Sequence, residues 1–453
     1  MIKFLSLKNV VGFTLAVVYF GFRVMNVFLV TPFFDEYDSP AYFRWKLYPS
    51  FRTHGITLLY SLINDEFIIC LIQAVIGALV WIYLWFIFQN LIKNTSVLII
   101  FTFLFYLLGS SSIIVEQDSS LLSESLSLSS TLFLIGVSIK IFINLKSPTN
   151  LEFILFGFAM IWFASTKSSN SIIAPLLVII YLLSLKTMKN RKLKFALAFA
   201  FSILSLFFFI NAMSSDITKT LTTSGTINNR LIFSEKWKDR LLNSGYPVEA
   251  IKIFNDYSKE NLGIPPDQAV VNLPQFKKWW DSGGDSFLLR FTLTNPDYAV
   301  IAPVALPLFS EKLNYRKSLL SGWSQGTDRT EEFNGFSNSR AHRTWFWPDE
   351  PEKAYLSLAI SFLIVGISLS LFTFLNKSRE FNSFLIIILL TVIWSYVNWW
   401  FGSKPSDMAR HNLSAALVFK VIPIFMITLS IDYLIKFKDV IFLRNAGVRT
   451  SLD

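Results

Sequence analysis

Charged residues and cysteine are both scarce in this chain of 453 residues. Asp, Glu, Lys and Arg together make up 16% of the sequence, whereas hydrophobic residues make up 53%. The single cysteine, Cys70, lies inside an apolar run, which excludes an intramolecular disulfide and a cysteine metal motif. Internal repeats, heptad arrays and low-complexity tails are also missing. The composition therefore excludes a soluble domain and indicates a membrane protein with several spans.

Ten apolar runs are long enough, or nearly long enough, to cross a hydrocarbon core about 30 Å thick, which takes roughly 20 helical residues. They cover residues 10–30, 67–92, 97–115, 119–139, 153–166, 168–185, 195–213, 355–375, 381–401 and 413–435. The fifth run is short and the fourth contains Glu124. The sequence therefore predicts an all-α polytopic protein with about ten transmembrane helices.

The distribution of basic residues predicts the topology. If the amino terminus is cytoplasmic, every inner connection is basic, from Lys3 and Lys8 to the tail at 436–449. This agreement with the positive-inside rule predicts that both termini are cytoplasmic. The net charge of +10 is then a sign of topology and not of nucleic-acid binding. Richness in Lys, Ile, Phe and Asn favours a bacterial cytoplasmic membrane as the location.

The spans divide the chain into three parts. Residues 1–213 form an N-terminal transmembrane module with an acidic first outer loop at 31–66. Residues 214–352 have turn-rich sequences and no clear span, so we expect a large, mostly helical insert on the periplasmic or extracellular side, with helices at 228–243 and 248–260. Residues 353–453 form a C-terminal transmembrane module with a basic cytoplasmic tail.

A polar stripe is predicted along the fourth span. Its members recur at helical spacing and comprise Gln117, Ser120, Glu124, Ser127 and Thr131. The serines alone fit a packing face that lets helices approach closely. Three acids, Glu116, Asp118 and Glu124, gather at the outer end of this span and are harder to explain as packing.

The first outer loop carries an acidic pair directly after the first span. Asp35 and Glu36 stand in the sequence FFDEYDSPAYF. A carboxylate at the mouth of a helix bundle can act as a general base toward an acceptor hydroxyl. The alternative is a solvated loop charge, and the sequence alone does not decide between the two.

Cations recur on the predicted outer side. Lys167 lies in a short connection, and Arg410 and His411 precede the last helix, whose N-terminus favours anions. Two deeper cations, Arg23 and Lys420, either reach the interface or pair with the acids of the fourth span. Together the outer cations suit the phosphate of a lipid-linked substrate.

Three of these segments resemble the membrane-integral glycosyltransferases of GT-C architecture, which include protein O-mannosyltransferases and bacterial lipid A aminoarabinose transferases. The segments are FFDEYDSPAYF after the first helix, LLSESLSLSS after the third span and SDMARHNLSAAL before the last helix. The resemblance covers the topology of residues 1 to about 210 and the loop with Arg410 and His411. It does not cover the insert.

The resemblance implies an enzyme that transfers a sugar from a polyprenyl-phosphate donor to a hydroxyl of a glycan, lipid or protein, with inversion, on the outer membrane face. It implies Asp35 and Glu36 as catalytic residues, and Lys167, Arg410 and His411 as donor-phosphate ligands. Glu116, Asp118 and Glu124 would organise the acceptor and the site. We expect no required cofactor or metal, although Asp35, Glu36, Glu116 and Asp118 could hold Mg or Mn if two outer loops meet.

Two other functions fit the same class of sequence. A polysaccharide polymerase or ligase of the O-antigen type shares many spans and an exported loop, but depends more on outer-loop arginines. A transporter of lipid-linked sugars places charges near the midplane and shows two related halves with broken helices. The chain shows no such halves, which favours the transferase.

Overall fold

The computed structural model describes residues 7–34, 39–44, 54–143, 149–184, 191–214, 216–260, 266–303, 347, 351–401 and 412–445. It is 88% helical. No strand occurs within these ranges, and an isolated bridge there pairs Phe33 with Ser120 in parallel. The predicted all-α class is therefore confirmed.

Seven helices of the described chain are long and apolar enough to cross a membrane. They are α1 (Leu7–Leu29), α4 (Glu66–Leu91), α7 (Glu124–Ile143), α11 (Arg191–Ser214), α20 (Pro351–Phe374), α21 (Ser378–Phe401) and α23 (Leu413–Asn445). Each overlaps one of the predicted spans, although α7 begins five residues later than the predicted span at 119–139. The protein is thus a multi-pass membrane protein by the length and composition of its helices.

The other three predicted spans form shorter apolar helices. They are α5 (Thr95–Gly109), α8 (Asn150–Thr166) and α10 (Ala174–Ser184), with 15, 17 and 11 residues. The run at 97–115 is predicted as one helix, but α5 ends at Gly109 because three serines follow and Ser111 Oγ donates to the Leu108 carbonyl at 2.8 Å. Serine hydroxyls that bond nearby carbonyls compete with helical hydrogen bonds.

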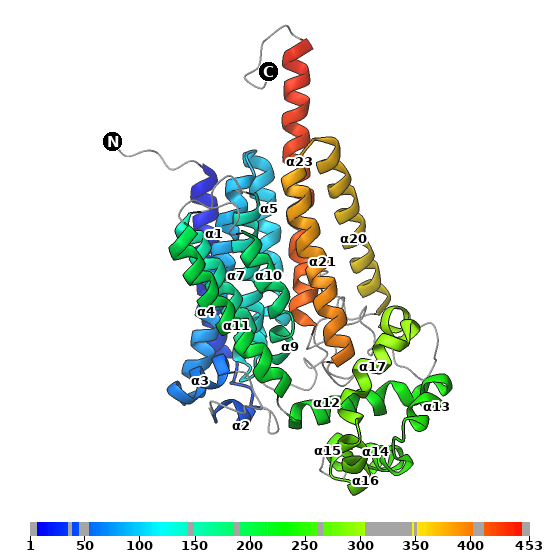
Figure 1. Cartoon of the computed structure of the whole chain (residues 1–453). Helices are drawn as coiled ribbons and strands as arrows, with labels where there is room; N and C mark the ends of the chain where they lie inside the picture. The colour runs from blue at the N-terminus through cyan, green and yellow to red at the C-terminus, as the bar shows by residue number, and fades with distance from the viewer. Residues whose placement is uncertain are drawn as a thin grey trace.

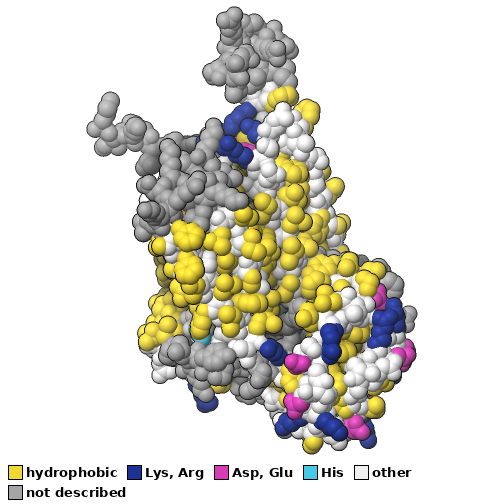
Figure 2. All heavy atoms as spheres, viewed as in Figure 1, with side chains coloured by type: hydrophobic (Ala, Val, Ile, Leu, Met, Phe, Trp, Pro, Cys, Tyr) yellow, Lys and Arg dark blue, Asp and Glu magenta, His cyan; other side chains and the backbone are white. Residues whose placement is uncertain are grey.

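The helices form one bundle with two different ends (Figure 1). The start of α1 and the end of α23 lie at one end, which we call the terminal end. The short helices α2 (Ser39–Tyr42) and α3 (His54–Ile63) lie at the opposite end, together with the helices of residues 216–303. We call this the insert end. Hydrophobic side chains cover the flank of the bundle between the two ends, as a membrane-embedded surface requires (Figure 2).

Helices α7 and α23 form the centre of the bundle. Helix α7 packs against α4, α8, α21 and α23, and α23 packs also against α5 and α20. The C-terminal helices therefore pack directly on the N-terminal ones. Aromatic rings fill this contact, and Phe88 of α4 stacks on Phe425 of α23 with ring centroids 3.8 Å apart.

The insert contains a small core of its own. Its helices are α12 (Asp216–Asn229), α13 (Glu235–Asn243), α14 (Val248–Glu260), α15 (Pro266–Val271), α16 (Pro274–Asp281) and α17 (Phe287–Thr294), followed by the π-helix η5 (Asp297–Ile301). Trp279 packs against Tyr246 and Phe287, with ring centroids 5.0 and 5.7 Å away. The predicted helix at 248–260 is confirmed. The predicted helix at 228–243 is wrong in its first part, because α12 ends at Asn229 and α13 begins at Glu235.

A buried arginine connects the insert to the bundle. Arg230 follows α12, and its guanidinium lies 4.4 Å from the ring centroid of Trp399 near the end of α21. Its Nη1 also donates to the Trp399 carbonyl. Burial lowers the pKa of Arg230, an effect that Tyr298 opposes.

Candidate functional site

A continuous polar segment is buried at the insert end of the bundle. All residues from 111 to 132 are buried. Most of them are polar, namely Ser111, Ser112, Glu116, Gln117, Asp118, Ser119, Ser120, Ser123, Glu124, Ser125, Ser127, Ser129, Ser130 and Thr131. So many buried polar groups must find hydrogen-bond partners, because unsatisfied ones are costly.

The segment is not the continuous helix that the stripe predicts. The chain forms α6 (Ser112–Val115), the 3-10 helix η1 (Glu116–Ser119) and an irregular stretch before α7 begins at Glu124. Gln117 and Ser120 therefore do not lie on the α7 face that carries Glu124, Ser127 and Thr131. The prediction of one five-residue stripe is wrong in its first two members.

Side chains of neighbouring helices hold the irregular stretch in place. Gln73 Nε2 in α4 donates to the carbonyls of Asp118 and Ser120, both at 3.1 Å. The Tyr60 hydroxyl in α3 donates to the Leu122 carbonyl at 2.8 Å. Burial raises the pKa of Tyr60 well above its usual range, so this hydroxyl stays protonated and remains a donor. These bonds replace the helical ones that the backbone lacks.

The connection that is predicted to form the first outer loop begins directly against this segment. Phe33 N donates to the Ser119 carbonyl at 2.7 Å, and Leu121 N donates to the Phe33 carbonyl at 3.0 Å. The two connections that are predicted to lie on the outer side thus meet at this bridge. Asp35 and Glu36 lie two and three residues beyond Phe33, outside the described residues.

Asp118 forms a buried ion pair with Arg23. Arg23 Nε lies 2.5 Å from Asp118 Oδ2, and Nη2 lies 2.9 Å from Oδ1. Ser125 Oγ donates to the same Oδ1 at 2.7 Å. Of the two interpretations of Arg23, pairing with an acid of this segment is therefore confirmed. Both oxygens of the Asp118 carboxylate already accept hydrogen bonds, which suits organisation of the site better than proton transfer or metal binding.

A second buried pair joins α7 to the connection after α8. Lys167 lies between α8 and α9 (Ser168–Ser171), and its Nζ is 3.1 Å from Glu124 Oε1. Their side chains are 8% and 2% exposed. The two residues were predicted to have separate roles, at the donor phosphate and in site organisation, and the structure brings them together.

Hydroxyl and amide groups surround this second pair. Asn170 Nδ2 donates to Ser127 Oγ at 2.9 Å and to Thr166 Oγ1 at 3.1 Å. Ser127 Oγ also lies 3.2 Å from Ser414 Oγ at the start of α23. Asn170 Oδ1 is buried and accepts no hydrogen bond from the residues that the structure describes. The site therefore contains an acceptor that is available to a polar ligand.

The remaining predicted site residues occupy different positions. Glu116 is buried in η1, in the same short helix as Asp118. Arg410 and His411 lie outside the described residues, immediately before the buried Asn412. Lys420 donates to Ser357 Oγ at 2.9 Å, so it bonds to α20 in the structure and not to an acid of the fourth span.

The described residues contain no group of three or more His, Cys, Asp or Glu side chains that could hold a metal ion. Glu116 and Asp118 belong to this described part, but Asp35 and Glu36 do not. Independence of a metal therefore stays a prediction.

Sequence reasoning missed several residues that build the site. Gln73 had a signal, because it is an amide within the otherwise apolar sequence of α4. Asn170 had a weaker one, since it lies three residues after Lys167. Tyr60 gives no signal, because a tyrosine in an apolar helix is usually part of the core.

These features define a polytopic helical membrane protein with a buried, charged and hydroxyl-rich site at one end of its bundle. No family model, characterised protein or solved structure matches the chain. The functional argument therefore depends on the geometry of the site.

Proposed function

We propose that this protein is a glycosyltransferase that moves a sugar from a polyprenyl-phosphate donor to an acceptor hydroxyl on the outer face of a bacterial cytoplasmic membrane. The observation that carries the proposal is the bridge between Phe33 and Ser120. It brings the start of the loop with Asp35 and Glu36 against the polar segment that leads to Glu124. Phe33, two residues before the candidate base in sequence, and the buried Lys167 thus lie at the same end of the bundle.

The chemistry assigns different roles to these groups. Asp35 takes the proton of the acceptor hydroxyl as that oxygen attacks the anomeric carbon, and the bond from this carbon to the phosphate oxygen breaks. Lys167, Arg410 and His411 stabilise the negative charge of the departing lipid phosphate. The bond to Glu124 Oε1 holds the Lys167 ammonium at this site.

The positions of the two ends support an outer-face site. The terminal end contains the start of α1 and the end of α23, and the sequence next to both is basic. The positive-inside rule assigns such an end to the cytoplasm. The polar segment and the insert lie at the other end, where a lipid-linked donor and an exported acceptor would meet.

A lipid-linked polysaccharide polymerase or ligase is the second candidate, and Arg230 favours it. Such enzymes depend on outer-loop arginines. The buried Arg230 packs over the ring of Trp399, and Trp399 stands three residues before the loop that contains Arg410. A transferase adds one sugar per acceptor, whereas a polymerase extends a chain, so the products separate the two candidates.

The test is transfer of radiolabelled sugar from polyprenyl-phosphate donors to membrane extracts by the purified full chain. We expect the wild type to transfer sugar, and Asp35→Asn and Arg410→Ala to lose that activity. Asp281→Asn is the control and should keep it, because Asp281 is an exposed residue of the insert. Gel filtration establishes that each variant is folded. The proposal would be contradicted if the wild type transferred sugar from none of the donors, or if Asp35→Asn kept full activity.

A further inference from the structure

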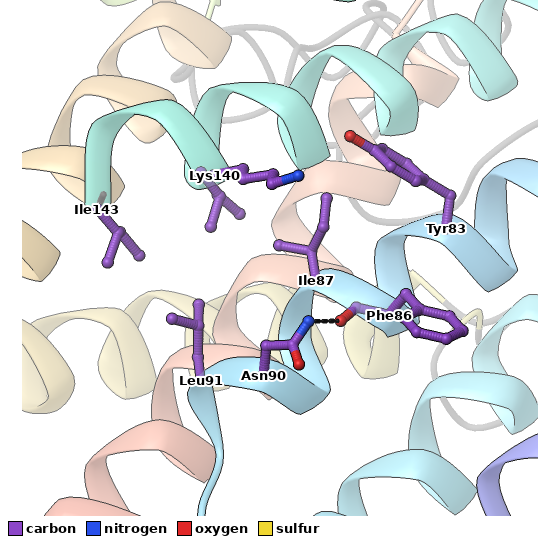
Figure 3. Close-up of a pocket in the computed structure, with 8 residues that line it drawn as sticks. Tyr83, Phe86, Ile87, Asn90, Leu91, Lys140 and Ile143 are labelled. Carbon is purple, nitrogen blue, oxygen red and sulfur yellow. Dashed lines mark hydrogen bonds between the residues drawn. The ribbon is translucent and has the colours of Figure 1, made fainter. Parts of the chain in front are cut away.

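A cavity of about 270 Å³ lies at the terminal end, between the last turns of α4 and α7 (Figure 3). Its polar lining comes from Tyr83, Asn90 and Lys140. Lys140 is 16 residues beyond Glu124 in α7, which corresponds to about 24 Å along the helix. The cavity is therefore separate from the candidate site.

One polar group of this cavity lacks a hydrogen-bond partner. The Tyr83 hydroxyl is buried and has no hydrogen-bond partner in the part of the chain that the structure describes. Lys140 extends across the cavity, with its ammonium on the side where the Tyr83 hydroxyl lies (Figure 3). A phenol and an ammonium that share one cavity form a suitable site for an oxyanion.

One acid already contacts Lys140, but it leaves donors available. Glu152 Oε1 lies 3.3 Å from Lys140 Nζ. The other oxygen of Glu152 accepts the Thr149 N–H at 2.8 Å as part of the capping box of α8. Lys140 thus has two further donors. Lys93 adds a second ammonium beside the cavity, because its Nζ donates at 2.8 Å to the carbonyl of Asn90.

The other walls of the cavity are apolar and continue onto the lipid-facing surface. Phe86, Ile87 and Ile143 line it, and the Phe86 ring is largely exposed on the flank of the bundle. An occupant with an anionic head and a hydrocarbon chain matches both kinds of wall. Basic pockets between helices near the cytoplasmic leaflet are suited to acidic lipids.

We propose that this cavity binds an acidic phospholipid. Its phosphate accepts hydrogen bonds from Lys140 and Tyr83, and one acyl chain lies along Phe86 and Ile143. The shared chemistry of anion and hydrocarbon would also suit a fatty acid, and separate lipid and fatty-acid probes distinguish the two. The site is independent of the proposed transferase activity.

The test is native mass spectrometry of the purified full chain with dioleoyl phosphatidylglycerol, dioleoyl phosphatidylcholine and oleate as separate probes. We expect saturable binding of phosphatidylglycerol to the wild type. Loss of a charge-assisted bond lowers that affinity about tenfold in Lys140→Gln, and Tyr83→Phe, which keeps the ring and the fold, lowers it a few-fold.

The matched control is Lys377→Gln, because Lys377 lies in the turn between α20 and α21, above the Tyr433 ring and away from the cavity. Its affinity should equal that of the wild type. Equal affinity for phosphatidylcholine, binding of oleate alone, or unchanged affinity in Tyr83→Phe and Lys140→Gln would each overturn the proposal.

Discussion

Arg23 and Asp118 are 95 residues apart in sequence and meet in a buried, bidentate ion pair. The pair joins α1 to the irregular segment before α7. Arg23 lies six residues before the end of α1, so the pair is about 9 Å inside the helix end. A buried pair of this kind fixes a conformation more than it adds stability, because desolvation offsets most of the attraction.

Removing one member of this pair should lower the stability of the fold strongly, whereas removing both members together should lower it much less. We expect Asp118→Asn and Arg23→Met each to destabilise the protein by about 3–5 kcal/mol, because a buried charge loses its partner. The double variant should regain most of that loss. Thermal unfolding in detergent measures all three, and two single effects that simply add in the double variant would contradict the interpretation.

Gly77 makes room for this arginine. A Cβ at position 77 would overlap the Arg23 guanidinium. We expect Gly77→Ala to displace the guanidinium and destabilise the protein by about 1–3 kcal/mol, as overpacking usually does. Gly21→Ala is the matched control, because a Cβ there meets no atom within 4 Å. Equal unfolding temperatures for the two variants would contradict the close approach.

The spans were predictable from sequence because hydrocarbon selects for apolar runs of a fixed length. The break in the helix before α7 was not predictable from sequence, because Gln73 and Tyr60 from other helices donate the hydrogen bonds to its backbone carbonyls. No local pattern encodes such partners.

Contacts between side chains that are distant in sequence could not be predicted from the sequence either. The sequence shows that Glu124 and Lys167 are unusual in apolar surroundings, but their 43-residue separation conceals the contact. Asp35, Glu36, Arg410 and His411 lie outside the described residues, so their roles stay predictions.

The insert should touch the membrane through one apolar face. Leu293 in α17 is 76% exposed, and Val300 and Ile301 of η5 are exposed near it in the chain. Trp400 Nε1 of α21 donates to the Ala299 carbonyl at 2.9 Å, which holds η5 beside the end of a candidate span.

Labelling with a polarity-sensitive fluorophore tests this face. Native Cys70 is buried, so a new cysteine is the preferred label site. In liposomes we expect blue-shifted emission from Leu293→Cys compared with Lys278→Cys, which lies on an exposed polar face of α16. Identical emission from the two sites would show that the face is in water.

Variants of the Glu124–Lys167 pair can distinguish a structural role of these residues from a functional one. Either single neutralisation leaves one buried charge without its partner and should destabilise the fold. The double variant Glu124→Gln with Lys167→Gln removes both charges together and keeps amide groups that can hydrogen-bond. It should therefore remain folded, as gel filtration and thermal unfolding would show.

Sugar transfer by this double variant then decides the role of Lys167. If its ammonium stabilises the leaving phosphate, transfer falls about 100-fold, as when an anion-stabilising donor is removed from an active site. The matched control neutralises the surface pair Lys236 and Asp297, whose side chains are 59% and 35% exposed, and should retain full transfer. A folded Glu124/Lys167 double variant with normal transfer would mean that the pair only joins α7 to α8, and that the donor phosphate is bound by other cations.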